Sequence, residues 1–302
     1  MVQSKQMNDK VLKIKIPPGN AFAYETHPLL PKAHMVSMAV APRGSGKSVA
    51  VSNLMKNLKF DRIFVISPTF NSNSSLMGML PIDHDDVYEN TDDPSVIDKI
   101  IRKVEEERDD LYKYQQDMKE YNKFMRNVRS GGHLQEESLF KFYKDGYFPK
   151  PEHKWDGNRP FMAVLCDDVQ GSKLMTSRKI DNLVIKHRHI GAFPDDQPSI
   201  GVSIFFLIQN YSSKAGGISR AIRNNATNML IFKMKDEKQL DQISSEVSGE
   251  VDKETFMKVY EKAVDEPHSF LFVDLFPKDT HPSQFRKRFD EFLIPSNSND
   301  AQ

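Results

Sequence analysis

The segment that most constrains the fold of this chain is residues 41–48, which read Ala-Pro-Arg-Gly-Ser-Gly-Lys-Ser. It follows an apolar run directly and precedes a helical pattern that continues through Leu58. This order is typical of a phosphate-binding loop, in which backbone N–H groups at a helix N-terminus surround a phosphate. The expected phosphate contacts come from Ala41, Gly44, Ser45, Gly46, Lys47 and Ser48. An ordinary glycine-rich turn is the alternative.

Two side chains of the loop have particular roles in such a site. Lys47 is expected to reach the β- and γ-phosphate oxygens, and Ser48 to ligate Mg²⁺. Ala41 stands where the usual pattern has glycine.

The apolar runs of the chain predict the fold class. They are near-continuous rather than alternating, as in strands of a mostly parallel sheet that is covered by helices on both faces. The runs are 36–41, 62–67, 161–166, 202–208, 228–232 and 270–273. We therefore predict an α/β fold, with 11–16 as an added edge strand.

The connection between the second and third predicted strands is much longer than a usual crossover. We expect an insertion at 71–158, with a long helix at 96–129 that ends at Gly131-Gly132. Two series with a seven-residue period define one face of this helix. They are Ile97, Val104, Leu111, Met118 and Met125, and Ile100, Glu107, Tyr114, Tyr121 and Val128. Either the helix is an arm that packs on its own domain through 134–143, or it contacts another subunit.

Polar residues follow two of the predicted strands. Asp167 and Asp168 come after the run at 161–166, and Gln209 follows the run at 202–208. Because the carboxyl ends of parallel strands open on the ligand crevice, Asp167 is the candidate for the Mg²⁺ shell, and Asp168 is the candidate general base. Gln209 would orient water or sense the γ-phosphate. Helix capping is the alternative for the acidic pair and for Asn210.

Charge is balanced, with 42 Lys and Arg against 42 Asp and Glu. This excludes a polybasic coating protein, so a nucleic-acid contact would need locally concentrated positive charge. The most basic stretch contains Lys173, Arg178, Lys179, Lys186 and Arg188. It would contact DNA phosphates, or it is a solvated helix face. His187 and His189 within and beside it are expected to be structural.

With these motifs in this order, the chain resembles the additional-strand group of P-loop ATPases. More narrowly, it resembles the FtsK/HerA-type genome-packaging ATPases of large eukaryotic DNA viruses, a poxvirus-like family. The matching residues are 41–48, Ile66-Ser67-Pro68-Thr69, Asp167-Asp168, Arg188-His189, and the stretch from Gln209 through 222–226 to 231–233. The resemblance covers about 30–280. The sequence departs from the family pattern at Ala41. It also departs at Ile208, where such families often have Thr.

The resemblance implies an ATP- and Mg²⁺-dependent motor that moves double-stranded DNA into a preformed capsid. It further implies a homo-oligomeric ring, capsid or portal-vertex partners, and an arginine that completes the neighbouring subunit's site. Arg223 is the favoured arginine, with Arg220 and Arg188 as alternatives. Competing readings are a nucleotide or small-molecule kinase with the insertion as a lid, and a non-catalytic scaffold or DNA anchor. The acidic pair and Gln209 argue against the kinase.

The remaining expectations concern domains and compartment. We expect an N-terminal extension at 1–30, an ATPase domain at 31–290, and a disordered tail at 291–302. The single cysteine, Cys166, excludes an intramolecular disulfide and favours a reducing compartment. The start of the chain is polar, and the apolar runs are too short to span a bilayer. We therefore expect an intracellular protein, in a cytoplasmic virus factory or the nucleus of the host, with virion association left open.

Overall fold

A computed structural model describes residues 24–70, 79–132, 135–195, 197–211, 217–248 and 251–295. The edge strand expected at 11–16 lies outside these ranges. The expected disordered tail is only partly within them, and its beginning is ordered. Glu291–Leu293 forms a strand that pairs with Phe285–Lys287, so the sheet extends into the tail that we expected to be disordered.

The described residues form one nine-stranded sheet in the order β3-β2-β4-β5-β1-β6-β7-β8-β9. Strands β1 to β6 run parallel, and β7 to β9 are antiparallel. The strands are β1 Val36–Val40, β2 Arg62–Ile66, β3 Val87–Tyr88, β4 Met162–Asp167, β5 Ser203–Ile208, β6 Asn228–Phe232, β7 Phe270–Asp274, β8 Phe285–Lys287 and β9 Glu291–Leu293. The predicted mostly parallel α/β sheet is therefore confirmed.

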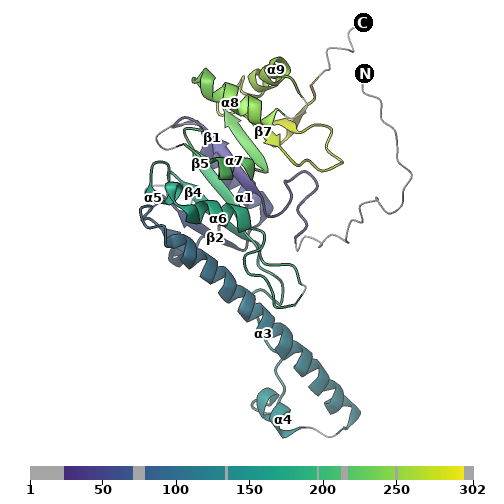
Figure 1. Cartoon of the computed structure of the whole chain (residues 1–302). Helices are drawn as coiled ribbons and strands as arrows, with labels where there is room; N and C mark the ends of the chain where they lie inside the picture. The colour runs from purple at the N-terminus through teal and green to yellow at the C-terminus, as the bar shows by residue number, and fades with distance from the viewer. Residues whose placement is uncertain are drawn as a thin grey trace, which may run out of the picture.

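Helices cover both faces of the sheet (Figure 1). Helix α1 packs on one face, and α3, α6, α7, α8 and α9 pack on the other. The helices are α1 Lys47–Leu58, α3 Val96–Ser130, α4 Glu136–Phe142, α5 Lys173–Thr176, α6 Arg178–Lys186, α7 Arg220–Asn224, α8 Glu237–Val247 and α9 Lys253–Ala263, with a short 3₁₀ turn at His84–Asp86. The sequence of β1 does not alternate between apolar and polar residues, because both faces of the strand are buried. Met38 and Val40 belong to one core, Ala39 belongs to the other, and all three are buried.

Helix α3 spans 35 residues, roughly 52 Å at 1.5 Å per residue, and projects from the sheet as an arm (Figure 1). The predicted helix at 96–129 is thus confirmed. The first part of its predicted face is buried in the sheet core, as at Ile97 and Val104. The distal part of this face packs on α4, where the ring centroids of Tyr121 and Phe142 are 5.4 Å apart. The arm therefore packs on its own chain, as the first of the two readings expected.

A short part of the insertion belongs to the sheet, whereas we expected a helical insertion at 71–158. Val87 and Tyr88 form β3, which pairs in parallel with β2. A two-residue strand has too few side chains to give a periodic pattern. Among the described residues, no helix combines the length and apolar character needed to cross a membrane.

Glu107, the charged residue on the apolar face of α3, is explained by a buried ionic network. Its carboxylate accepts hydrogen bonds from Arg62 Nη1 at 2.7 Å and from Trp155 Nε1 at 2.7 Å. Asp86 accepts from Arg62 Nε at 2.6 Å. Burial raises the pKa of Glu107, but hydrogen bonds from Trp155 and Lys154 outweigh it, so the pKa lies below its ordinary value.

Replacing Glu107 with Ala should lower the free energy of unfolding by about 2 kcal/mol, because Arg62 and Trp155 lose a buried acceptor. Urea unfolding at pH 7 measures the change. Since the folded pKa is lowered, this stabilisation is present above the unfolded pKa and is lost as the pH falls through the folded pKa. The variant should therefore lose less stability than the wild type on acidification. An equal loss in the exposed control Glu105→Ala would contradict the assignment.

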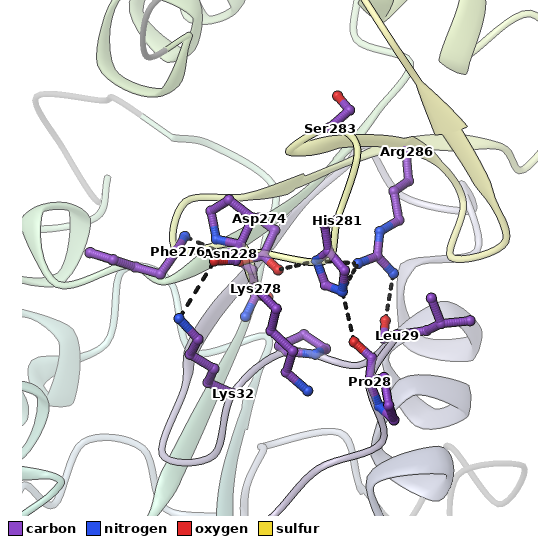
Figure 2. Close-up of polar contacts among 12 residues, drawn as sticks. Pro28, Leu29, Lys32, Asn228, Asp274, Phe276, Lys278, His281, Ser283 and Arg286 are labelled. Carbon is purple, nitrogen blue, oxygen red and sulfur yellow. Dashed lines mark hydrogen bonds and ion pairs between the residues drawn. The ribbon is translucent and has the colours of Figure 1, made fainter.

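The segment before β1 is tied to the sheet at the edge where the parallel strands begin. Figure 2 shows His281 and Arg286 reaching this segment. His281 Nε2 lies 2.7 Å from the Pro28 carbonyl oxygen, and Arg286 Nη1 donates to the Leu29 carbonyl oxygen at 2.5 Å. The described part of the expected 1–30 extension is therefore packed onto the domain.

Candidate nucleotide-binding site

The loop between β1 and α1 has the backbone of an anion cradle. Gly44 and Gly46 have φ of 78° and 92°, in the left-handed region that favours glycine. Gly46 is the N-cap of α1, so the first turn of the helix opens on the loop. A phosphate there would meet the unpaired N–H groups and the positive end of the helix dipole.

Ala41 does not belong to the wall of the site, which corrects the expectation of a phosphate contact. It is completely buried, and its N–H donates to the Ile208 carbonyl oxygen at 3.0 Å. Its methyl group is part of the core beneath α1. Ala41 thus continues the packing of β1, and the usual glycine is not required there because its φ is not positive.

A cavity of about 640 Å³ lies at the carboxyl ends of the parallel strands. It brings together the predicted residues of the loop, the acidic pair and Gln209. The lining residues are Arg43, Gly44, Ser45, Gly46, Lys47, Ser48, Val49, Thr69, Asp167, Asp168 and Gln209. Sequence reasoning gave no role to Arg43, Val49 or Thr69. Thr69 follows the end of β2 and belongs to the stretch 66–69 that carries the family resemblance, but no role was predicted for it.

The two acids differ in environment. Asp167 ends β4 and is 5% exposed. Burial raises its pKa, the Lys47 ammonium lowers it, and the neighbouring Asp168 raises it again, with a net increase. Asp168 is exposed and has a φ of 56°, a region that Asp enters more readily than most residues. The turn after β4 therefore leaves Asp167 beside the loop and turns Asp168 into the open cavity.

Gln209 contacts the candidate base directly. Its Nε2 donates to Asp168 Oδ1 at 3.3 Å. Gln170 holds the end of β5, because its Oε1 accepts the N–H of Gln209 at 2.6 Å and the N–H of Asn210 at 3.0 Å. Gln170 is a positioning residue that sequence reasoning missed. The residues that it contacts lie about forty positions away in the sequence, so no local sequence pattern predicts these contacts.

The donor set fits a magnesium-bound nucleoside triphosphate. Within the described residues, the Lys47 ammonium makes no hydrogen bond or ion pair, and it lies where it influences Asp167. Ser48 and Asp167 offer the oxygen ligands that Mg²⁺ prefers. Cys166 gives no sign of reactivity, because burial raises the pKa of its thiol to about 12.

The favoured arginine, Arg223, lies outside the cavity. It pairs with Glu246, and its guanidinium carbon lies 5.4 Å from the centre of the Tyr211 ring. Its side chain is only 16% exposed. The alternatives Arg220 and Arg188 are exposed. In this chain, Arg223 therefore belongs to an internal network, and a role in a neighbouring subunit's site stays a prediction for all three.

Because β5 separates β1 from β4, and the loop after β1 faces the acids after β4, the chain has the additional-strand form of the P-loop fold. No protein-family model matches the sequence, and no curated protein is similar enough to indicate a relationship.

Several solved structures are similar in fold. B204, the DNA-packaging ATPase of Sulfolobus turreted icosahedral virus, has 13% identity and a TM-score of 0.45, over 80% of this chain and 93% of B204. EssC (ATPases 2 and 3) of Geobacillus thermodenitrificans has 16% identity and a TM-score of 0.41, over 80% of this chain and 37% of EssC. The pCW3 conjugation coupling protein TcpA has 15% identity and a TM-score of 0.40, over 86% of this chain and 61% of TcpA.

Proposed function

We propose that this chain is a Mg²⁺-dependent ATPase that couples hydrolysis to the movement of double-stranded DNA, as in viral genome packaging. The observation that carries the proposal is the contact between Gln209 and Asp168 opposite the phosphate loop. A carboxylate and an amide at this position can hold and deprotonate a water molecule. The same position in a phosphotransfer enzyme would need to admit an acceptor substrate.

The placement of each residue supports a catalytic role in this proposal. Lys47 binds the terminal phosphates, and Asp168 accepts the proton of the attacking water that Gln209 orients. Ser48 and Asp167 would hold Mg²⁺, which supplies charge neutralisation for the phosphate oxygens.

The inserted arm does not favour the kinase alternative. None of the residues that line the cavity comes from the described parts of the insertion, 79–132 and 135–158. The arm instead extends away from the sheet (Figure 1). The scaffold alternative is tested by the turnover measurement below.

The DNA contact is proposed for helices α5 and α6 and for Arg188, which follows α6. Lys173, Arg178, Lys179, Lys186 and Arg188 are all exposed, and Lys179 pairs with Asp98 of α3 at 2.5 Å. The opposite face of α6 is buried through Ile180, Leu183 and Val184, so the basic side chains point away from the core. His187 is structural, with Nε2 at 2.8 Å from the His34 carbonyl oxygen. A ring of copies would direct such side chains at DNA phosphates without reading sequence. Ring assembly and capsid or portal partners belong to this proposal through the family resemblance.

ATP turnover with and without double-stranded DNA, across salt concentrations, tests the function. We expect DNA to stimulate turnover at low salt and the stimulation to fall steeply as salt increases, because phosphate contacts release counterions. Light scattering in parallel should show a homo-oligomer. The pair Arg178→Ala and Lys186→Ala should weaken stimulation, and the exposed control pair Lys56→Ala and Lys119→Ala should not. No stimulation at any salt would contradict a translocase, and no hydrolysis at all would favour the scaffold.

A further inference from the structure

The far end of the arm has a small aromatic core of its own. The ring of Phe124 on α3 lies 5.5 Å from the ring of Phe142 on α4 and 5.0 Å from the ring of Phe148, measured between centroids. The Tyr121 hydroxyl donates to the Phe148 carbonyl oxygen at 2.9 Å. These contacts fix α4 and the turn after it against α3. The outer face of α4 is therefore part of a folded surface.

This outer face carries three exposed aromatic rings. Phe140 is 82% exposed, Tyr143 is 54% exposed and Tyr147 is 56% exposed. Glu136 lies four positions before Phe140 and Tyr143 lies three positions after it, so the three share one side of the helix end. We call Glu136, Phe140, Tyr143 and Tyr147 the tip patch. Large apolar side chains that are exposed together mark a contact surface, and aromatic rings contribute strongly to protein interfaces.

The tip patch has negative surroundings. The exposed acids of 136–147 are Glu136, Glu137 and Asp145. None of them forms an ion pair within the described residues, whereas Lys141 pairs with Asp117 at 2.6 Å and with Glu120 at 2.7 Å. Lys144 is the remaining cation of this segment. Three acids against one cation favour a partner that is apolar and positively charged.

A second surface with exposed apolar side chains lies at the edge of the sheet where the parallel strands begin. Hydrogen bonds join the segments 26–32 and 276–281 side by side there (Figure 2). Leu29 is 51% exposed and Phe276 is 59% exposed. We call this surface the edge patch, and its members are Leu29, Lys32, Phe276 and Lys278.

The edge patch has positive surroundings. Its two segments contain Lys32 and Lys278 against one acid, Asp279. Burial lowers the pKa of Lys278, and Asp274 acts against this effect. The cations Lys32 and Arg286 lower the same pKa further, so it lies below its ordinary value. Positive charge is thus concentrated at the edge patch, and it complements the negative tip patch.

Buried polar groups hold the edge patch in position. Asp274 Oδ1 accepts the N–H of Phe276 at 3.2 Å, and Arg286 Nη1 donates to the Leu29 carbonyl oxygen at 2.5 Å. Asp274 and Arg286 are both buried. A surface whose backbone is already fixed loses less conformational entropy when a partner binds.

The two patches lie on opposite halves of the molecule. The arm follows β3 at one edge of the sheet, and the edge patch follows β7 in the other half. The arm extends away from the sheet, so the tip patch lies apart from the edge patch of its own chain (Figure 1). Nine strands span roughly 38 Å at about 4.8 Å per step, and α3 is roughly 52 Å long, so the arm is long enough to reach a neighbouring copy.

We propose that the tip patch of one copy binds the edge patch of a second copy of this chain, in a head-to-tail contact. The aromatic rings of the tip patch would pack on the apolar side chains of the edge patch, and its acids would face the lysines. Two different complementary surfaces on one molecule generate a ring, or a filament where the rotation does not close. The inference rests on the proposed function for its ring, and it adds the surfaces that would join the copies.

A charge exchange tests the contact. The tip variant carries Glu136→Lys and Glu137→Lys, and the edge variant carries Lys32→Glu. Each variant alone would place like charges opposite each other, so we expect self-association to weaken about tenfold or more relative to wild type. An equimolar mixture of the two variants restores opposite charges at every contact and should associate as wild type does. Sedimentation equilibrium without DNA or nucleotide measures the dissociation constants.

Two further variants separate the apolar contribution from a general effect of charge. Phe140→Ser should also weaken self-association about tenfold, because it removes the most exposed ring of the tip patch. Ile185→Ser is its control, since Ile185 is an exposed apolar residue of α6 outside both patches. Glu105→Lys with Glu106→Lys is the control for charge, because these exposed acids belong to the same arm. Both controls should associate as wild type does.

The outcomes distinguish this inference from the proposed function. If the wild type stays monomeric, if the tip variant associates normally, or if the mixture is not restored, the contact is wrong, and ATP turnover still decides the function. If the tip variant associates normally but binds double-stranded DNA more weakly, the partner of the tip patch is DNA and the contact is also wrong. If charge exchange controls association but no ATP is hydrolysed, the contact stands and the proposed function fails.

Discussion

Replacing Lys47 with Ala is expected to reduce ATP turnover at least a hundredfold, and to weaken ATP binding as well. The ammonium group lies at the cavity wall beside Asp167, where phosphate charge would accumulate. A cation held at such a site stabilises the charge that develops on the transferred phosphoryl group. Turnover at saturating ATP and calorimetric binding in the presence of Mg²⁺ measure the two effects separately.

The matched control for this prediction is Lys56→Ala. Lys56 is in the last turn of the same helix, α1, and it is exposed away from the cavity. Its loss should change neither ATP binding nor turnover. If Lys47→Ala retained ATP binding and turnover, the loop would not be part of the catalytic site. This conclusion would hold whatever the effect of DNA.

Asp168→Asn is expected to lower turnover by about 10² to 10⁴ and to leave ATP binding nearly unchanged. The amide cannot accept a proton from water, and that range is typical for the loss of a general base. Asn tolerates the left-handed backbone at this position as Asp does, so the turn after β4 should persist. Single-turnover hydrolysis and ATP binding by calorimetry distinguish the chemical step from binding.

Asp279→Asn is the control, since Asp279 is an exposed acid that does not line the cavity. It should hydrolyse ATP at the wild-type rate. Full turnover in Asp168→Asn would show that Asp168 is not the base, and the hydrogen bond from Gln209 would then be structural. A parallel loss of binding and turnover would also contradict the assignment, because a general base acts after the nucleotide is bound.

The residues that the sequence could identify are those whose role is local. The loop at 41–48 is continuous in the chain, and Asp167, Asp168 and Gln209 each follow a strand whose apolar run is visible by itself. Parallel strands end at one edge, so these positions had to converge, and the cavity confirms that they do. The apolar face of α3 could be predicted for the same reason, because a seven-residue period is visible within the sequence of a single helix.

The residues that the sequence could not identify act through partners distant in the chain. Gln170 holds the end of β5, and His268 Nδ1 lies 3.2 Å from the Ser45 carbonyl oxygen of the phosphate loop. The short strand β3 and the strands β8 and β9 join the sheet through backbone pairing, which leaves little trace in a short segment. Ala41 shows the converse, since a motif position that looked functional is a core residue.

By itself, the sequence determined the α/β class, the phosphate loop and the acids and amide that face it, because apolar runs and local motifs need only neighbouring residues. Only the tertiary structure decided that Ala41 lies in the core, that Gln209 contacts Asp168, and that 26–32 lies beside 276–281. The physical reason is that these features depend on distances between segments that are far apart in the chain. Burial and hydrogen bonding across the sheet define those distances, and no single stretch of sequence contains them.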